Sequence, residues 1–123
     1  MKMYEVSPQD TASHFIGSGA LDYSWWGIMS AYGIAQLDVP DDWYVVLVDE
    51  DEPGEAVRVD HTVILKAVNT LARTAKGNCP EYMRQSVLRE CGVFIKDPEG
   101  ADFDADMADQ VLQYIVFGKV IYA

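Results

Sequence analysis

The sequence predicts an α+β fold, with a small antiparallel sheet of about three strands packed on one side by three or four helices. Segments rich in aromatic and β-branched residues gather in the first half of the chain, whereas segments with helical periodicity dominate the second half. Half of the 123 residues are hydrophobic, which is enough for one core. Residues 1–123 are therefore expected to form a single domain.

The first helix is predicted from its start signals. Ser7 suits the N-cap, Pro8 suits the first helical position, and Asp10 lies in the first turn. Gly17 closes this short helix soon afterwards. Residues 3–6, which precede it, are expected to form a short strand or an extended lead-in.

Three strands are predicted next. Residues 24–34 have the aromatic content of a strand, and a bulge near one of their glycines is expected. Residues 43–49, WYVVLVD, are the clearest strand of the chain. A Pro-Gly turn at 53–54 leads into residues 56–59, which return as the partner strand of a hairpin.

The second half is predicted to be helical. Asp60 is expected to cap a helix that its apolar periodicity extends to Ala75, before Gly77 ends it. A further helix is expected from Pro80 to about Glu90.

The final helix follows an acidic entry and turns apolar. Gly118 follows its last turn and is expected to end the helix in the left-handed conformation. Residues 120–122 are apolar, so they are expected to dock in the core. The entry carries four carboxylates, which are expected to complement the helix dipole and cap free N–H groups: Asp102, Asp104, Asp106 and Asp109.

The negative charge is concentrated in the first half of the chain. The formal net charge is −11, and residues 1–60 hold twelve acids against two bases. A surface of this charge repels nucleic acid and anionic lipid but attracts basic proteins. The expected partner is therefore a basic protein surface, such as that of a DNA-binding host protein, and neither nucleic acid nor a membrane is expected.

Acids around the predicted hairpin are the candidate protein-binding residues. A DNA-mimicking surface would need carboxylates at phosphate-like spacing, although a dense charge run is more often a solvated loop. The candidates are Asp41, Asp42, Asp49, Glu50, Asp51, Glu52 and Glu55.

One interpretation of this aromatic stretch is a binding patch that consists of Trp25, Trp26 and Tyr32. The alternative is that one indole belongs to the core and the other covers an edge. A pocket in the stretch 23–32 would suit a small enzyme or ligand-binding domain, which is the rival functional class. A structural or oligomer-forming protein, such as a homodimer, is the third.

No motif fixes a catalytic chemistry, a cofactor or a metal site. Asp102, Asp104 and Asp106 have the spacing of a calcium loop, but Met107 replaces the required Gly and Gln113 the required Glu. The histidines, His14 and His61, belong to no catalytic motif and are expected to be structural. The protein is expected to be non-enzymatic.

The cysteines and the N-terminus favour a cytoplasmic protein of the host cell. Cys79 and Cys91 match no zinc pattern and are expected to be free thiols. Residues 1–10 lack the apolar segment of a signal peptide, and no apolar run is long enough for a membrane span.

The C-terminal segment 108–122, ADQVLQYIVFGKVIY, resembles the tail of small acidic proteins, without an assigned activity, that are encoded by actinobacterial phages and integrative elements. Those tails often follow an AD…Q…FGE..YG pattern after an acid-rich entry. This chain departs in having Lys119 where Glu is common and Ala123 at its end. The resemblance implies a phage or mobile-element origin and transfers no functional residue. The function expected is that of an accessory or inhibitory protein-binding factor.

Overall fold

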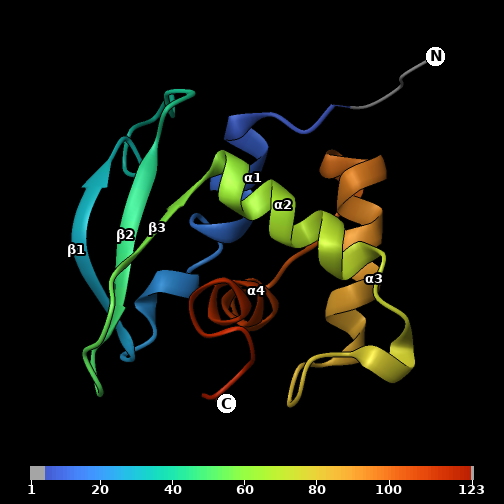
Figure 1. Ribbon diagram of the computed structural model, residues 1–123. Helices are drawn as coiled ribbons and strands as arrows, with labels where there is room; N and C mark the ends of the chain where they lie inside the picture. The colour runs from blue at the N-terminus through green and yellow to red at the C-terminus, as the bar shows by residue number, and fades with distance from the viewer. Residues whose placement is uncertain (1–4, 123) are drawn as a thin grey trace.

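A three-stranded antiparallel sheet lies beside a group of helices in the computed structural model, which describes residues 5–122 (Figure 1). The strands are β1 (Trp26–Tyr32), β2 (Tyr44–Asp49) and β3 (Val57–Asp60), in the order β1-β2-β3. The helices lie on one side of this sheet, so the predicted α+β fold is confirmed.

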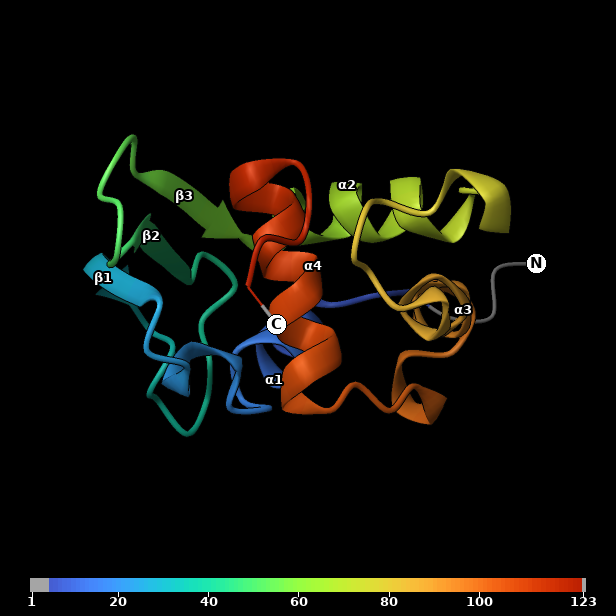
Figure 2. The same cartoon turned by 90° about the horizontal axis from the view of Figure 1, so that it is seen from below.

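Four α-helices form the rest of the domain. In the view from below, α4 lies between the sheet and α3 (Figure 2). Helix α2 packs against both α3 and α4, and α1 packs against α4. Their bounds are α1 (Pro8–Phe15), α2 (His61–Ala72), α3 (Gln85–Lys96) and α4 (Ala105–Phe117), with short 3₁₀ turns at Ala20–Asp22, Lys76–Asn78 and Pro98–Gly100.

The predicted helix caps are present. Ser7 accepts a hydrogen bond from the N–H of Asp10, whose carboxylate accepts one from the N–H of Ser7 in return. Asp60 caps α2 by accepting from the N–H of Val63 at 3.0 Å. Gly118 ends α4 in the left-handed conformation, with φ of 78°.

The boundaries of two helices differ from the prediction. Helix α2 ends at Ala72, and Gly77 belongs to a separate 3₁₀ turn. Helix α3 begins at Gln85 and continues through Gly92 to Lys96. A glycine inside a helix costs about 1 kcal/mol relative to alanine, and the burial of Phe94 in the following turn outweighs that cost.

The segments before α1 and around β1 also refine the prediction. Residues 3 and 4 lie outside the described part of the chain, and residues 5–6 form no strand. Strand β1 is shorter than the predicted 24–34, and its register with β2 shifts between Ile28 and Ser30. The predicted bulge is therefore present, with Met29 as the extra residue.

The core lies between the sheet and the helices. Val45 and Leu47 of β2 and Val59 of β3 are fully buried against it. An aromatic group joins α1 to α3, since the ring of Phe15 lies 5.5 Å from that of Phe94, centroid to centroid. The fully buried Trp43 donates its indole N–H to the carbonyl of Pro8 at 2.8 Å, which fixes the start of α1 beside β2.

Candidate protein-binding surface

Strand β1 is the most exposed element of the sheet. The five residues 28–32 are all exposed, although the strand begins with the buried Trp26. Ile28 is 50% exposed and Met29 is 67% exposed. Four of the seven large hydrophobic side chains that are exposed in residues 5–122 lie on β1 or in the loop after it: Ile28, Met29, Tyr32 and Leu37. The β1 side of the sheet therefore carries most of the exposed large hydrophobic side chains of the described residues.

The outer edge of β1 has no partner strand within residues 5–122, because β1 is the first strand in the sheet order. In Figure 1 it forms the margin of the molecule, farthest from the helices. In an antiparallel pair, alternate residues direct their N–H and C=O groups away from the neighbour. A row of main-chain donors and acceptors thus lies beside the exposed apolar side chains.

The outer face of the sheet continues this surface. The register places Tyr32 opposite Tyr44, so their side chains share a face, and their ring centroids lie 6.3 Å apart. The guanidinium of Arg58 lies 4.2 Å from the ring centroid of Tyr44 and pairs with Asp60 at 3.4 Å. The cationic group on this face is therefore already engaged in two contacts.

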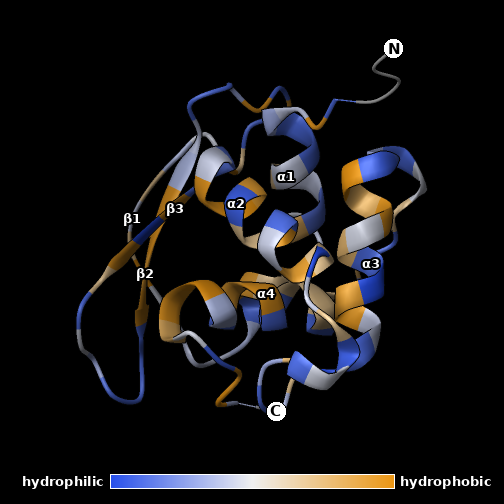
Figure 3. Cartoon of the chain, turned by 45° about the vertical axis from the view of Figure 1, so that its right-hand side comes forward, coloured by the Kyte–Doolittle hydropathy of each residue, from blue (hydrophilic) through white to orange (hydrophobic). Residues whose placement is uncertain are grey.

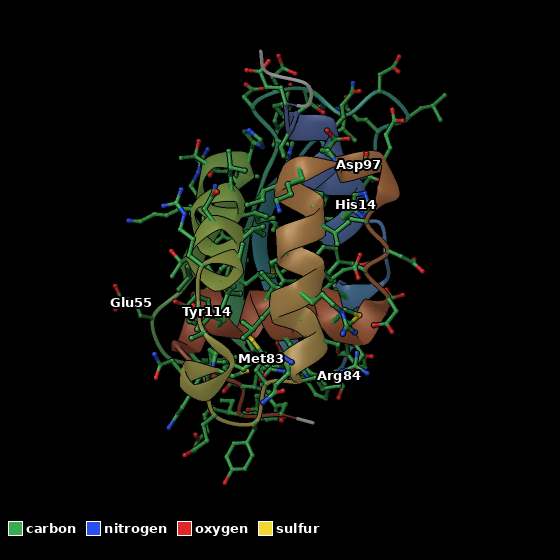
Figure 4. The ribbon with its side chains drawn as sticks, turned by 90° about the vertical axis from the view of Figure 1, so that its right-hand side faces the viewer. His14, Glu55, Met83, Arg84, Asp97 and Tyr114 are labelled. Carbon is green, nitrogen blue, oxygen red and sulfur yellow. The ribbon has the colours of Figure 1, made fainter. Side chains whose placement is uncertain are left out.

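Exposed carboxylates lie at both ends of the sheet. The β2–β3 hairpin loop carries four of them, Glu50, Asp51, Glu52 and Glu55. This loop is a hydrophilic segment in Figure 3, and Glu55 points away from the body of the molecule in Figure 4. The loop between β1 and β2 carries Asp38, Asp41 and Asp42, also exposed. The six residues of β2 lie between the two groups and extend about 17 Å, at about 3.4 Å per residue.

The shape of the β1–β2 loop depends on Gly33. Its φ of 78° is rarely adopted by other residues, and a Cβ there would lie 2.7 Å from Cδ of Pro40. Close packing of Pro40 on Gly33 turns the chain sharply after β1. The loop then exposes Leu37 completely, beside the acids of this end.

Asp49 does not belong to the exposed acidic surface. It is 7% exposed, and both of its carboxylate oxygens accept hydrogen bonds from the hydroxyl of Tyr122, at 2.7 and 2.8 Å. Burial alone would raise the pKa of Asp49. The hydrogen bonds from Tyr122 and from the N–H groups of Glu52 and Asp51 outweigh this effect and lower its pKa. Asp49 therefore shapes the hairpin loop and attaches the C-terminal tail.

The two tryptophans of the predicted aromatic patch point inward to α4. The indole N–H groups of Trp25 and Trp26 both donate to Oδ1 of Asp109, at 3.0 and 2.6 Å. Trp26 is buried and Trp25 is half-buried, whereas Tyr32 lies at the opposite end of β1. The three residues form no single patch, and the alternative of one core indole and one edge indole describes the arrangement better.

Asp109 is a buried acid that the sequence interpretation placed among the capping residues. It lies within α4 and is 1% exposed. Burial raises the pKa of Asp109, and the hydrogen bonds from Gln113, Trp25 and Trp26 offset only part of this rise. Its role is to connect the start of β1 to α4. One sequence signal could have indicated this buried role: Asp109 lies four residues before Gln113 in an otherwise apolar helix.

Trp25, Trp26, Asp109, Gln113 and Tyr122 together form what we call the buried polar group. Gln113 attaches the C-terminal tail to it. Its Nε2 donates to Oδ2 of Asp109 at 2.7 Å and to the carbonyl of Tyr122 at 2.9 Å. Its Oε1 accepts from the N–H groups of Ile121 and Tyr122. The ring of Tyr122 stacks on Trp25, with centroids 5.2 Å apart. The predicted docking of the tail holds for the buried Val120 and the half-buried Tyr122, whereas Ile121 is exposed.

The remaining acids of the α4 entry have structural contacts. Asp104 caps α4 by accepting from the N–H of Met107. Arg84, at the start of α3 (Figure 4), pairs with Asp104 at 3.5 Å and Asp106 at 3.2 Å. Within residues 5–122 no group of three or more His, Cys, Asp or Glu side chains could hold a metal ion.

The histidines and a cavity lie away from the sheet surface. His14 packs edge-on against Phe94, with ring centroids 5.1 Å apart. Nδ1 of His61 lies 3.0 Å from the hydroxyl of Thr11, which also donates to the carbonyl of Pro8. His61 and Leu65 line a cavity of about 620 Å³ beside the start of α1. This cavity is separate from the predicted aromatic pocket at residues 23–32.

Comparisons with protein-family models, curated proteins and solved structures found no match for this chain. Among the described residues, no helix combines the length and hydrophobicity needed to cross a membrane.

Proposed function

We propose that this chain is a non-enzymatic acidic factor that binds a basic protein through the β1 side of its sheet. The observation that carries the proposal is the arrangement of β1: exposed apolar side chains lie between two groups of exposed carboxylates. Protein interfaces commonly combine an apolar centre with a polar rim. A basic partner would bury Ile28 and Met29 while its cations approach the acids at each end.

The charge distribution supports a basic partner. Residues 3–57 contain no Lys or Arg, and this segment includes β1, β2 and both acidic loops. Lys66, Arg73, Lys76, Arg84, Arg89 and Lys96 all lie on the helical side, between α2 and the end of α3. The sheet therefore presents negative potential that would speed encounters with a positive surface and disfavour a negative one.

An accessory or inhibitory factor of a phage or mobile element is the concrete form of this proposal, in keeping with the resemblance of the C-terminal segment. A DNA-mimicking version would use the two acidic ends of the sheet. Asp41 and Asp42 would act at one end, and residues 50–55 at the other. Asp49 is excluded from that role because Tyr122 and the loop N–H groups already occupy it.

The test compares two triple variants of equal charge. Glu50, Asp51 and Glu52 are changed to their amides in one variant. Glu81, Glu99 and Asp102, which are exposed on the helical side, are changed in the other. Each variant removes three negative charges from the formal −11. The immobilised proteins are incubated with host lysate at about 20 mM and about 150 mM salt, where screening differs strongly.

The wild-type chain should retain a basic protein at low salt and lose most of it at the higher salt. The hairpin variant should retain much less, whereas the helical-side variant should behave as the wild type. Equal loss in both variants would show that only net charge matters. Retention of no basic protein at low salt would refute the proposed function.

A further inference from the structure

We infer that the free edge of β1 binds an extended segment of the basic partner as an added fourth strand. This inference rests on the proposed function and specifies how the partner is recognised. The added strand would pair its main chain with the outward N–H and C=O groups of β1. Its cationic residues would lie at both ends, over the hairpin loop and over the β1–β2 loop.

The edge lacks the features that commonly prevent strand addition. Exposed edges are usually protected by charged side chains, by proline or by a covering loop. The β1 sequence, WGIMSAY, contains no charged residue and no proline. Residues 28–32 are exposed, so nothing within the described chain covers them. The bulge at Met29 is the one protective feature, and its extra side chain is itself two-thirds exposed.

The spacing of the acids sets the pattern of the partner. The two acidic groups lie beyond the two ends of β2, and Asp42 and Glu50 are eight positions apart, up to about 27 Å at about 3.4 Å per residue, which an extended chain covers in about eight residues. A matching strand of about eight residues therefore has Lys or Arg at both ends and about four apolar or hydroxyl residues between them. The central residues would contact Ile28 and Met29, and the terminal cations would reach Asp41 and Glu50.

A second copy of this chain is a poor occupant of the same edge. Antiparallel pairing of two β1 edges would place the hairpin loop of one copy beside the β1–β2 loop of the other. Parallel pairing would place like loops together. Both arrangements bring acidic groups against acidic groups, between chains that each carry −11. Like charges across an interface disfavour association, so the edge is better matched to a cationic segment.

The test uses the unmodified protein and three synthetic peptides of equal charge. The first, Lys-Lys-Val-Thr-Val-Thr-Lys-Lys, has its cations at the ends. The second has the same composition with the four lysines at the centre. The third repeats the first sequence with all four central amides N-methylated, which removes the central donors of both strand edges. Binding is measured by fluorescence anisotropy at about 20 mM salt, and amide exchange of β1 is followed by NMR.

The end-charged peptide should bind at least tenfold more tightly than the other two and should slow amide exchange at alternate residues of β1. Equal binding of the end-charged and N-methylated peptides would refute strand addition but leave a charge-driven function intact. Equal binding of the end-charged and centre-charged peptides would refute the proposed spacing. Slow exchange of the β1 edge without peptide, in a sample that sediments as a dimer, would identify the second copy as the occupant and overturn the inference. Failure of the lysate experiment, in contrast, would refute the function itself.

Discussion

Substitution of Asp109 tests whether the buried polar group attaches the sheet to α4. In Asp109→Ala, the two indole N–H groups lose their acceptor, and Gln113 loses one of the two acceptors of its Nε2. In Asp109→Asn, one oxygen remains for the indoles, but the new amide N–H groups face those of Gln113. The alanine variant should therefore be the less stable of the two.

The magnitude follows from the burial of each donor. A buried donor left without a partner costs about 1–3 kcal/mol. Trp26 is buried and should contribute the full cost, whereas Trp25 is half-buried and can reach water. Part of the loss is offset because the carboxylate itself is costly to bury. We expect about 2–4 kcal/mol for Asp109→Ala and about 1–2 kcal/mol for Asp109→Asn, against a typical total of about 5–15 kcal/mol.

Guanidinium chloride unfolding, followed by far-UV circular dichroism, measures both variants. Asp102→Ala is the matched control, because Asp102 is exposed and its contact to Glu90 uses the main-chain N–H. The control should change stability by less than about 0.5 kcal/mol. A loss below about 1 kcal/mol in Asp109→Ala would refute the reasoning, since the buried indole of Trp26 must then have found another acceptor.

The pH dependence gives a second signature of Asp109. Its pKa is raised in the folded state, so the folded chain binds this proton more tightly than the unfolded chain does. The wild type should therefore gain stability relative to Asp109→Asn as the pH falls through this raised pKa. A difference that is constant with pH would contradict the assigned direction of the shift.

Three further predictions concern the tail, a helix cap and the thiols. The hydrogen bond to Asp49 raises the pKa of Tyr122 to about 12. Stability should therefore fall as the pH rises from about 10, the ordinary phenol value, to about 12. Unfolding measurements on Tyr122→Phe should no longer show this alkaline dependence, and an unchanged profile would contradict the contact. Asp60→Ala removes the acceptor of the Val63 N–H and should cost about 1 kcal/mol of stability in chemical unfolding. Asp60→Asn should retain most of the cap, so equal losses in the two variants would argue against a capping role for Asp60. Burial raises the pKa of Cys91 to about 12, while Cys79 is only half-buried. A thiol reagent should therefore label Cys79 first in the native state. Faster labelling of Cys91 would contradict the packing of α3.

Local signals in the sequence were sufficient for the starts of α1 and α2 and for the hairpin. Ser7 and Asp60 each bond to an N–H three residues ahead, so their role depends on a few neighbouring residues. The Pro-Gly pair at 53–54 likewise lies in the loop that joins β2 and β3. Such interactions are encoded within one turn of chain and need no knowledge of the tertiary fold.

The buried polar group could not be predicted because its members are distant in sequence. Trp25 and Asp109 are 84 positions apart, and Tyr122 and Asp49 are 73 apart. By composition, Asp49 resembles its exposed neighbours in the hairpin loop. Only the docking of the tail, which brings a phenol to its carboxylate, distinguishes it from Glu50. The extension of α3 through Gly92 has the same origin, since the packing of Phe94 overrides a local helix-breaking signal.

The position of the buried polar group also explains why the start of β1 is fixed while the rest of the strand is exposed along a free edge. Trp25 and Trp26 attach the start of the strand to α4, while residues 28–32 are exposed and pair only with β2. An edge fixed at one end and paired along one side loses little conformational freedom when a second strand binds. Weakening the attachment should therefore weaken strand addition as well as stability. The end-charged peptide should bind Asp109→Asn less tightly than the wild type, under conditions in which the variant remains folded.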